Sequence, residues 1–425
     1  MAETLAHLSP LHVPPDPARE DPSGECDVAV VGAGILGLAV AREVTLRHPE
    51  LSVRVLEKEA EVGFHQTGHN SGVVHAGIYY APGSLKARLC VSGSRELYEY
   101  CDAHGIPAER SGKLIVATTA EELPRLDELE RRGAANGVPG LRRIDGAEIP
   151  GIEPHARGVA ALHSPQTGVV DFPEVARAFA EDVRAAGGMV CTGCGVTGVE
   201  RRSGRTHLRH RKGELHARHV VFCAGGWADR LARATGAPED PRIVPFRGAW
   251  LRLAPERRHL VRGMIYPVPD PSLPFLGVHL TRHADGEVLV GPTALLAGAR
   301  DAYRLTRVRG EDVRSTLTWP GSWRMARRWW RHGLREMRHA ASRRALVADA
   351  ARYVPELRPE DVRSGPAGVR AQALGRDGSL IDDFVFSEAE GALHVRNAPS
   401  PAATASLAIA RLVVDRADEA MGTRP

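Results

Sequence analysis

Three glycines near the start of the chain have the spacing of a dinucleotide-binding turn. Gly32, Gly34 and Gly37 form a G-x-G-x-x-G motif directly after the apolar run that begins at Asp27. In such a motif the first glycine permits a tight turn, the second lets the backbone approach a pyrophosphate, and the third lets the helix pack on the strand. The N–H groups that begin this helix then face the phosphates. The motif therefore predicts a site for FAD or NAD.

A carboxylate follows at the distance expected for a contact with ribose. Glu57 comes 20 residues after Gly37, at the end of a second predicted strand, residues 52–56. A carboxylate in this place accepts hydrogen bonds from ribose hydroxyls and repels a 2′-phosphate. The pattern favours the ADP half of FAD or NAD and disfavours NADP.

The segment that follows, residues 65–80, is rich in small residues and hydrogen-bond donors. It reads HQTGHNSGVVHAGIYY, with three histidines, Asn70, Ser71 and three glycines in 16 positions. Polar groups cost free energy when they are buried without a partner. We therefore expect this loop to run close to a large planar polar ligand, which favours FAD. An NAD-dependent enzyme is a more remote alternative, and it would purify colourless.

The elements that position these residues alternate between strands and helices. The glycine motif lies in a strand–helix–strand unit of roughly 30 residues, typical of a right-handed parallel crossover. Helices are predicted at residues 173–186, at 322–352 and after Ser400. Further strands are predicted at residues 189–192, 195–201, 207–210, 220–223, 248–253, 275–280 and 287–291.

Nucleotide-binding segments lie at both ends of the chain, so we expect the domains to interleave. The predicted fold class is α/β, with a Rossmann-like FAD-binding domain and a substrate domain that has a mixed or antiparallel sheet. Residues 1–25 lack a basic start followed by an apolar run, so they are expected to be a disordered leader and not a secretory signal. The FAD-binding domain is assigned to residues 26–105, 155–240 and 350–420, and the substrate domain to residues 106–154 and 241–349.

The composition of the 425 residues excludes several classes of protein. With 43% hydrophobic and 25% charged residues the chain has an ordinary globular balance, and a net charge of +4 does not indicate a dedicated nucleic-acid binder. Six cysteines do not make a disulfide scaffold. Cys191 and Cys194 form a C-x-x-C without a second pair, so no metal site is predicted. The longest nearly uncharged apolar stretch, residues 28–41, is shorter than the ~18 residues of a membrane span.

An ordered set of short motifs resembles one enzyme family. HQTGHNSGVVHAGIYY, PGSLKARLC, PFRG, YPVPDPSLPFLGVHLTR, PAGVRAQ, DGSLIDDF and NAPSPAATAS occur in this order between residues 27 and 416. Together they are similar to the L-2-hydroxyglutarate dehydrogenase/oxidase family of the glycine-oxidase-like (DAO) flavoproteins. The resemblance implies non-covalent FAD, oxidation of L-2-hydroxyglutarate to 2-oxoglutarate, and transfer of electrons to a quinone or another acceptor.

The same resemblance extends the set of residues expected to contact FAD. Val196 is expected near the adenine, and Ala224 and Gly225 end a strand beside the dinucleotide. Residues 397–404 are expected to open the last helix, with prolines in its first turn. The positive end of that helix would stabilise the anion formed when the flavin is reduced. Besides Gly32, Gly34, Gly37 and Glu57, the predicted contacts are Lys58, Thr67, His69, Asn70, Ser71, Gly72, Val196, Ala224, Gly225, Pro399, Ser400, Ala402 and Thr404.

The implied substrate has two carboxylates, and arginine suits a carboxylate because its fork fixes orientation as well as charge. Arg370 in GVRAQ matches the G-x-R position that anchors the substrate carboxylate in the wider flavoprotein group. Arg247 in PFRG and Arg282 in HLTR are candidates for the distal carboxylate, and the choice between them stays open. Tyr266 is a further candidate for substrate binding.

A base must also take the proton of the substrate hydroxyl, and histidine, with an unperturbed pKa of ~6.5, is suited to this. His279 lies on a predicted strand between Val278 and Leu280, and alternation places it on the opposite face from both. His75 lies in the loop expected near the flavin. Both histidines stay open as the base.

Alternatives remain for the reaction and the partners. The chain would otherwise oxidise a related 2-hydroxy acid or an amino acid, or it would be a flavin-binding interaction protein without catalysis. The aromatic and basic run at residues 319–331 departs from the family pattern. It would either contact an anionic membrane surface or form an ordinary helix that buries its tryptophans. We expect a cytoplasmic protein, peripheral at the inner face of the plasma membrane.

Overall fold

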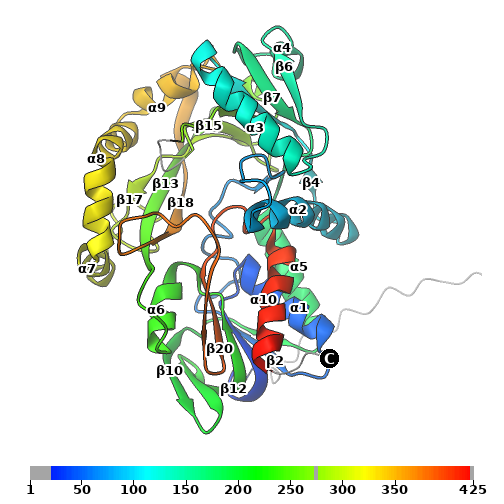
Figure 1. Ribbon diagram of the computed structural model, residues 1–425, viewed down its shortest axis with the longest axis vertical. Coiled ribbons are helices and arrows are strands. Elements are labelled where there is room, and N and C mark those ends of the chain that lie inside the picture. The colour runs from blue at the N-terminus through cyan, green and yellow to red at the C-terminus, as the bar shows by residue number, and fades with distance from the viewer. Residues whose placement is uncertain (1–20, 272–275, 422–425) are drawn as a thin grey trace, which may run out of the picture.

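The structure is a computed structural model, and it describes residues 21–271 and 276–421. Figure 1 shows one large sheet with its helices in the lower half of the view and a second in the upper half. Most of the predicted leader, residues 1–20, lies outside the described residues. None of the described helices is long and apolar enough to cross a membrane.

The first sheet has a parallel core. β1 pairs in parallel with β12 on one side and with β2 on the other, β2 pairs in parallel with β9, and the end of β12 pairs in parallel with β20. β10, β11 and β19 extend the sheet with antiparallel pairs. Its strands are β1 (Gly24–Val31), β2 (Val53–Leu56), β9 (Met189–Cys191), β10 (Val196–Arg202), β11 (Arg205–His210), β12 (Gly213–Phe222), β19 (Val385–Ala389) and β20 (Ala392–Asn397).

Three helices pack together with this sheet. α1 (Ile35–Arg47) lies against α5 (Phe172–Ala185) and α10 (Ser406–Met421). Val30 of β1, Leu38 of α1 and Phe179 of α5 are fully buried in one core that also takes in α10. Burial on both faces explains why the second half of β1, residues 28–31, is entirely apolar, as in other parallel sheets.

The second sheet is mostly antiparallel, and among its described strands β14 and β5 are the pair that runs in parallel. β13 lies next to the edge strand β18 and pairs on its other side with β16 and β17. α9 (Arg343–Ala350) packs against β16, and α3 (Leu123–Ala135) against β5 and β7. The strands are β5 (Lys113–Ala117), β6 (Arg142–Asp145), β7 (Ala160–Ser164), β13 (Arg242–Leu253), β14 (Met264–Pro267), β15 (His279–Arg282), β16 (Val288–Gly291), β17 (Leu295–Leu296) and β18 (Val362–Leu374).

The remaining strands and helices belong to neither of the two large sheets. A small third sheet has the strand order β3, β8, β4. The remaining strands and helices are β3 (Val73–Val74), β4 (Ala108–Glu109), β8 (Gly168–Val170), α2 (Leu85–Ala103), α4 (Ile149–Ile152), α6 (Ala228–Ala234), α7 (Gly310–Leu317) and α8 (Pro320–Ala341).

The α/β class and most predicted elements are confirmed. The helix predicted at 173–186 is α5, the strands predicted between 189 and 223 are β9 to β12, and the helical region 322–352 is α8 and α9. The predicted domain boundaries stay a prediction. Two strands lie outside the sheet that those boundaries suggest, because β7 and β18 pair in the second sheet.

The prediction that residues 397–404 open the last helix is wrong. α10 begins at Ser406, and residues 400–405 form turns before it. A residue that precedes proline avoids the helical region, because the proline ring clashes with its backbone. Ser400 precedes Pro401, so the chain enters the regular helix only beyond that pair. Ala405 donates its N–H to the Pro401 carbonyl at 2.9 Å, in the last turn before the helix.

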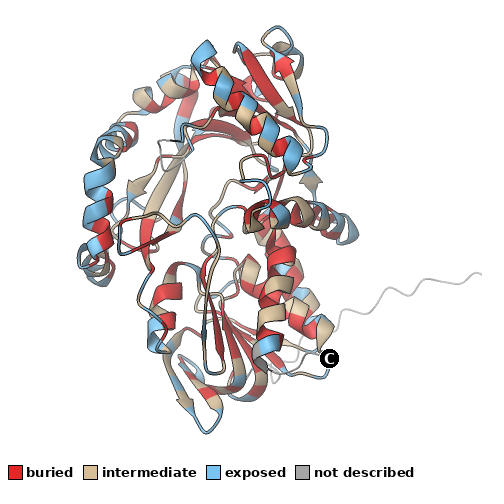
Figure 2. Ribbon diagram, in the orientation of Figure 1, coloured by how far each residue is buried: buried red, intermediate tan, exposed pale blue. Residues whose placement is uncertain are grey.

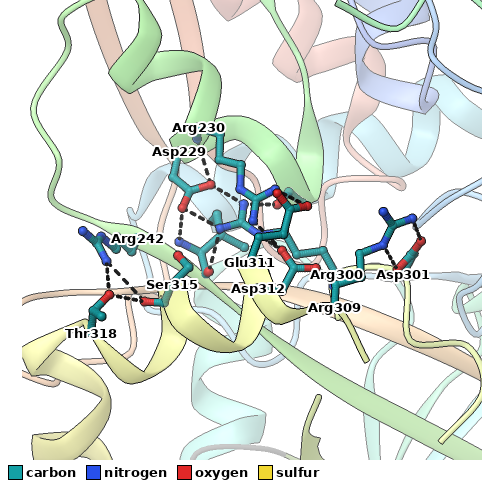
Figure 3. Close-up of polar contacts among 12 residues, drawn as sticks. Asp229, Arg230, Arg242, Arg300, Asp301, Arg309, Glu311, Asp312, Ser315 and Thr318 are labelled. Atoms are coloured by element: carbon teal, nitrogen blue, oxygen red, sulfur yellow. Dashed lines mark hydrogen bonds and ion pairs between the residues drawn. The ribbon is translucent and has the colours of Figure 1, made fainter. Parts of the chain in front are cut away.

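A buried ion-pair network links α6 to α7 (Figure 3). The Arg300 guanidinium, 1% exposed, bonds both carboxylate oxygens of Asp229, 4% exposed, with one contact at 2.8 Å. The Arg300 backbone N–H donates to Asp312 at 3.0 Å, and Arg230 donates to the other oxygen of Asp312 at 2.6 Å. Arg300 also donates to the Gly226 carbonyl at 2.6 Å, beside the turn predicted to contact FAD.

Asp229→Asn is expected to lower the free energy of unfolding by roughly 3 kcal/mol, because the buried Arg300 guanidinium loses the carboxylate that binds it through two oxygens and keeps the longer contact to Asp312 at 3.4 Å. Denaturant unfolding of the purified variant measures this. Glu311→Gln is the matched control in the same network, since Glu311 pairs with Arg230 at 3.1 Å but is exposed. We expect the control to cost about 1 kcal/mol or less. Equal losses in the two variants would contradict the prediction.

Candidate active site

The glycine turn joins the end of β1 to the start of α1. Gly32 has φ +108°, and a Cβ there would lie 2.5 Å from the Cys223 carbonyl oxygen. A Cβ on Gly37 would lie 1.9 Å from the Gly32 carbonyl oxygen. Neither position accepts a side chain, so α1 packs directly on the strand, in the way that the motif predicts.

The first turn of α1 leaves its positive end open to an anion. Gly34 is the N-cap and has no side chain to cap the helix, and the first turn has no acidic residue. Thr67 accepts a hydrogen bond from the Ile35 N–H at 2.9 Å, which holds the following loop against the helix start. Such an end, with positive partial charge, suits a pyrophosphate.

Glu57 lies beside the same turn. Its two carboxylate oxygens accept the N–H of Ala33 at 2.8 Å and of Glu59 at 2.9 Å. Burial is the largest influence on this carboxyl and raises its pKa. Because a carboxylate has about four acceptor positions, two remain for ribose hydroxyls. The ribose contact stays a prediction.

Other predicted FAD contacts line the chain next to Glu57. The Lys58 ammonium lies 3.9 Å from the centre of the Trp227 ring and also contacts Glu59. Val196 is the first residue of β10. A Cβ added to its neighbour Gly195 would contact the Cβ of Lys58, so the chain passes close to Lys58 at this point. Ala224 and Gly225 follow the end of β12. The structure therefore brings these segments to one edge of the first sheet.

The histidine-rich loop is held by its own side chains. The Asn70 amide donates to the Thr67 carbonyl at 2.5 Å and accepts the Gly72 N–H at 2.7 Å. Gly72 has φ +67°, a conformation that favours glycine, and Ser71 beside it is half-buried. The His69 ring stacks on Tyr303 with centroids 3.7 Å apart.

The C-terminal segment meets this loop although more than 300 residues separate them in sequence. Thr404 accepts the His75 backbone N–H at 3.1 Å and donates to the Val73 carbonyl at 3.3 Å. The Ser400 hydroxyl lies 3.2 Å from His75 Nε2. Pro399 and Ala402 belong to the same turn, where the Ala402 N–H donates to the Pro399 carbonyl at 3.0 Å.

His279 is buried on β15, and its Nδ1 donates to the Gly277 carbonyl at 2.9 Å. This bond fixes the neutral tautomer with a lone pair on Nε2, as a general base requires. Burial, more than the nearby Lys113 and Arg370 charges, lowers the pKa of His279 to about 4. Its ring stacks on Tyr266 with centroids 4.0 Å apart.

His279 lies on the opposite face of β15 from its neighbours Val278 and Leu280, as the alternation of side chains predicts. Val278 and Leu280 belong to a hydrophobic core on the other side of the strand, together with Tyr353. His75, the second candidate base, also has its pKa held well below the usual value, first by burial and then by Lys113 and His279. The two histidines therefore face the same site.

Lys113 is a functional candidate that the sequence analysis did not select. It is buried on β5, with its ammonium 4.2 Å from the Tyr266 ring centre and 5.4 Å from that of Tyr79. Burial lowers the pKa of Lys113 to about 7. Lys113 acts on the pKa of both candidate histidines, so a buried cation lies close to them.

Arg370 lies on β18, and its charge lowers the pKa of His279, which indicates that the two are close. Phe246 of β13 is the cross-strand partner of Arg370, so these two residues share one face. The Arg370 side chain is exposed, yet loss of hydration lowers the pKa of its guanidinium.

The two arginines proposed for the distal carboxylate are placed elsewhere. Arg247 pairs with Val369, the neighbour of Arg370, so alternation turns it to the opposite face. Its guanidinium donates to the Tyr303 carbonyl at 3.3 Å. Arg282 is three residues from His279, and therefore on the other face of β15. The structure brings neither of them to His279, and Lys113 is the cation beside it.

The sequence profile of the DAO family, described as FAD dependent oxidoreductase, matches residues 27–416. The chain belongs to this family. It is 49% identical to the mitochondrial L-2-hydroxyglutarate dehydrogenase of Nematostella vectensis, covering 94% of this chain and 91% of the relative. It is 47% identical to the mitochondrial enzyme of Homo sapiens (95% and 90% covered) and 43% identical to the L-2-hydroxyglutarate dehydrogenase of Indibacter alkaliphilus (91% and 98%).

Solved structures support the fold of this FAD-dependent oxidoreductase. L-α-glycerophosphate oxidase from Mycoplasma pneumoniae, with FAD bound, superposes with a TM-score of 0.75 at 23% identity, covering 92% of this chain and 94% of that one. Glycine oxidase from Geobacillus kaustophilus gives 0.67 at 21% identity, with the same coverage. At these identities the likeness concerns the fold alone.

The residues present fit the cofactor of this oxidoreductase. The turn at Gly32 and Gly37 has no room for side chains, and the start of α1 at Gly34 has no capping group of its own. An anionic group that accepts from the helix end suits both observations. FAD, bound non-covalently, is therefore the cofactor.

In the described part of the oxidoreductase, one group of side chains has the spacing of a metal site. It consists of His207 of β11 with Glu214 and His216 of β12, whose ligand atoms lie within 4.8 Å of one another. These strands belong to the antiparallel extension of the first sheet. The candidate base and cations come from other elements, so the chemistry argued below does not use this group.

Proposed function

We propose that this oxidoreductase oxidises L-2-hydroxyglutarate to 2-oxoglutarate. The observation that carries the proposal is the buried His279, neutral at physiological pH, with the Lys113 and Arg370 cations acting on its pKa. A base with two cations near it suits a substrate that carries a hydroxyl and two carboxylates. Three relatives at 43–49% identity named for this activity support the same substrate.

The chain's own side chains divide the work. Arg370 holds one carboxylate through its fork, and Lys113 supplies a compact charge for the other. His279 Nε2 takes the hydroxyl proton, while the Nδ1 bond to the Gly277 carbonyl keeps the ring oriented. Tyr266 supports His279 by stacking and lies under the Lys113 ammonium. When bound, FAD supplies the acceptor for the hydride of the hydroxyl-bearing carbon.

His75 stays the second candidate for the base. Its Nε2 lies beside the Ser400 hydroxyl, in the loop predicted to contact the flavin. In that case His279 would position the substrate. Both assignments remain proposals, and they predict different variants to be inactive.

Anaerobic titration of the purified protein with each enantiomer of 2-hydroxyglutarate tests the function. The L-enantiomer is expected to bleach the flavin absorbance, and the D-enantiomer is not. Faster bleaching by another 2-hydroxy acid or an amino acid would replace the substrate. Bound FAD that no compound reduces would indicate a flavin-binding protein without catalysis.

We propose a quinone as the electron acceptor. Because such a quinone is dissolved in a membrane, the protein would bind at the membrane surface as a peripheral protein. Rapid reoxidation of the reduced flavin by a soluble quinone, with slow reoxidation by oxygen, is the expected result. Reoxidation by oxygen at the faster rate would instead make the protein an oxidase.

The Michaelis constant for the dicarboxylate is expected to rise above pH 7 by up to about tenfold per pH unit, while saturated turnover changes little. The reason is that Lys113, with its pKa lowered to about 7, loses its charge as the pH increases through that value. Steady-state kinetics between pH 6 and about 9 measure this. Lys113→Arg is expected to flatten the profile because arginine stays charged. An unchanged rise in Lys113→Arg would assign the titration to another group.

A further inference from the structure

The outward side of α8 carries a stripe of exposed apolar side chains. Trp323 is 62% exposed, Trp330 56%, Leu334 52% and Met337 53%. The α8 backbone is not helical at Trp329, which divides the helix into two segments. In the second segment the spacing of 4 and 3 residues places Trp330, Leu334 and Met337 on one face, and Trp323 is the exposed apolar residue of the first segment. The opposite side holds Met325, which packs in the core with Trp319. Single exposed apolar residues are ordinary, whereas a continuous stripe marks an interaction surface.

The four tryptophans of residues 319–331 divide between the buried and the exposed side of α8, and therefore neither of the two alternatives raised for this run holds for all of them. Trp319, just before α8, is buried and donates its Nε1–H to the Leu374 carbonyl at 3.0 Å, and Trp329 packs beside it. These two hold the helix on β18. Trp323 and Trp330 point outward instead. Figure 2 shows α8 at the edge of the molecule, largely in the colour of exposed residues.

The same helix is strongly basic. It has six arginines and one acidic residue, Glu336, which is buried and accepts the Ala294 N–H at 2.6 Å. Arg327 and Arg331 are exposed, and Arg331 lies over the Trp330 ring at 5.3 Å. The arginines border the apolar residues on one flank in each segment of α8, because at about 100° per residue they lie about 40–140° around the helix from Trp323 before Trp329, and about 80–140° from Trp330 after it. They are Arg324, Arg327, Arg328, Arg331, Arg335 and Arg338.

We propose that this surface, the outward face of α8 from Trp323 to Met337, docks on an anionic lipid membrane. Tryptophan suits the level of the lipid headgroups, and arginines beside an apolar stripe suit a negatively charged leaflet. The inference deepens the peripheral location proposed above, and it does not depend on which substrate is oxidised.

The other partners fit less well. A second copy of the chain would place the same surface against itself across a twofold axis, and would oppose six arginines to six arginines. An RNA backbone would satisfy the arginines but would leave Leu334 and Met337 without an apolar partner. A lipid surface satisfies the charge and the apolar stripe together.

Flotation of the full-length, FAD-loaded protein with vesicles tests the proposal. We expect binding to phosphatidylcholine vesicles that contain phosphatidylglycerol, weak binding to phosphatidylcholine alone, and release as ionic strength rises. The double variant Trp323→Ser, Trp330→Ser and the double variant Arg327→Gln, Arg331→Gln are each expected to lower binding at least about tenfold.

Matched control variants remove exposed apolar groups elsewhere. Leu46→Ser with Val159→Ser changes side chains that are 58% and 46% exposed and lie outside α8. It is expected to bind vesicles like the unaltered protein. All variants are expected to keep the same rate of flavin reduction in solution, which separates this test from that of the substrate.

Three results would overturn the proposal. One is equal binding of the unaltered protein to neutral and anionic vesicles, or no binding. Another is equal binding by the α8 variants and the control. The third is loss of a dimer, or of nucleic-acid binding, in the tryptophan variant without any loss of vesicle binding.

Discussion

His279→Gln is expected to lower turnover by roughly 100-fold or more while FAD stays bound. General base catalysis contributes about 10²–10⁴-fold, and glutamine keeps much of the volume and one polar group but accepts no proton at neutral pH. The loss should appear in the rate of flavin reduction under single-turnover conditions, where product release plays no part. FAD content, measured from the visible spectrum, serves as the check that the site has not collapsed.

His75→Gln is the comparison that decides between the two candidates. If His279 is the base, His75→Gln is expected to lower turnover less than His279→Gln. The pH profile adds a separate readout. With a pKa of about 4, His279 is deprotonated through the neutral range, so the acid limb of kcat/KM should lie near pH 4 and not near 6.5. Full activity in both variants would remove histidine as the base.

The nucleotide-binding half of the fold could be predicted because its signals are local. A Cβ on Gly37 would meet the Gly32 carbonyl oxygen five residues earlier, and Gly32 has a φ of +108°, which favours glycine. The second constraint on Gly32, the Cys223 carbonyl, is distant in sequence and follows β12, the spatial neighbour of β1. Glu57 follows at the end of a strand that pairs directly with β1. The type and spacing of the residues are therefore enough to predict short-range geometry of this kind.

The pairing of distant strands could not be predicted in this way. Arg370 and Arg247 were predicted to hold different carboxylates of one substrate, but the β13–β18 register turns them to opposite faces. A shift by one residue would exchange those faces. No local pattern sets that register, because the two strands lie more than 100 residues apart in sequence. Arg282 and His279 are separated by an odd number of residues on one strand. Their side chains therefore lie on opposite faces of the sheet.

The sequence contains an indication of Lys113 that is easy to overlook in a chain so rich in arginine. Four of the 56 basic residues are lysines, and this one stands at the head of the apolar strand KLIVA. A lysine in a chain that otherwise uses arginine, at a position that must be buried, indicates a compact charge with an adjustable pKa. Lys58 and Lys86 also lie close to predicted site residues, and Lys86 binds Asp382 at 2.8 Å. The scarcity of lysine is therefore a second sequence feature, beside the arginines, that indicates candidate site residues.

Arg370→Met is expected to lower kcat/KM for the dicarboxylate by about 100-fold. The fork of Arg370 forms two charge-assisted hydrogen bonds with a carboxylate, and truncating one side of such a pair in a desolvated site costs about 2–5 kcal/mol. Arg370→Lys should recover part of the loss because the charge returns without the fork. Binding of 2-oxoglutarate, followed by the perturbation of the flavin spectrum, should weaken in parallel, which separates substrate affinity from chemistry.

Arg247→Met is the matched control for this prediction. Arg247 lies one strand away but faces the Tyr303 side, so its removal should change 2-oxoglutarate binding by less than about threefold, within the range of ordinary surface effects. A larger loss in Arg247→Met than in Arg370→Met would move the substrate to the other face of the β13–β18 pair. His279, which shares its site with Arg370, would then be too remote to act as the base. The two arginine variants therefore test the location of the substrate, and with it the assignment of the base.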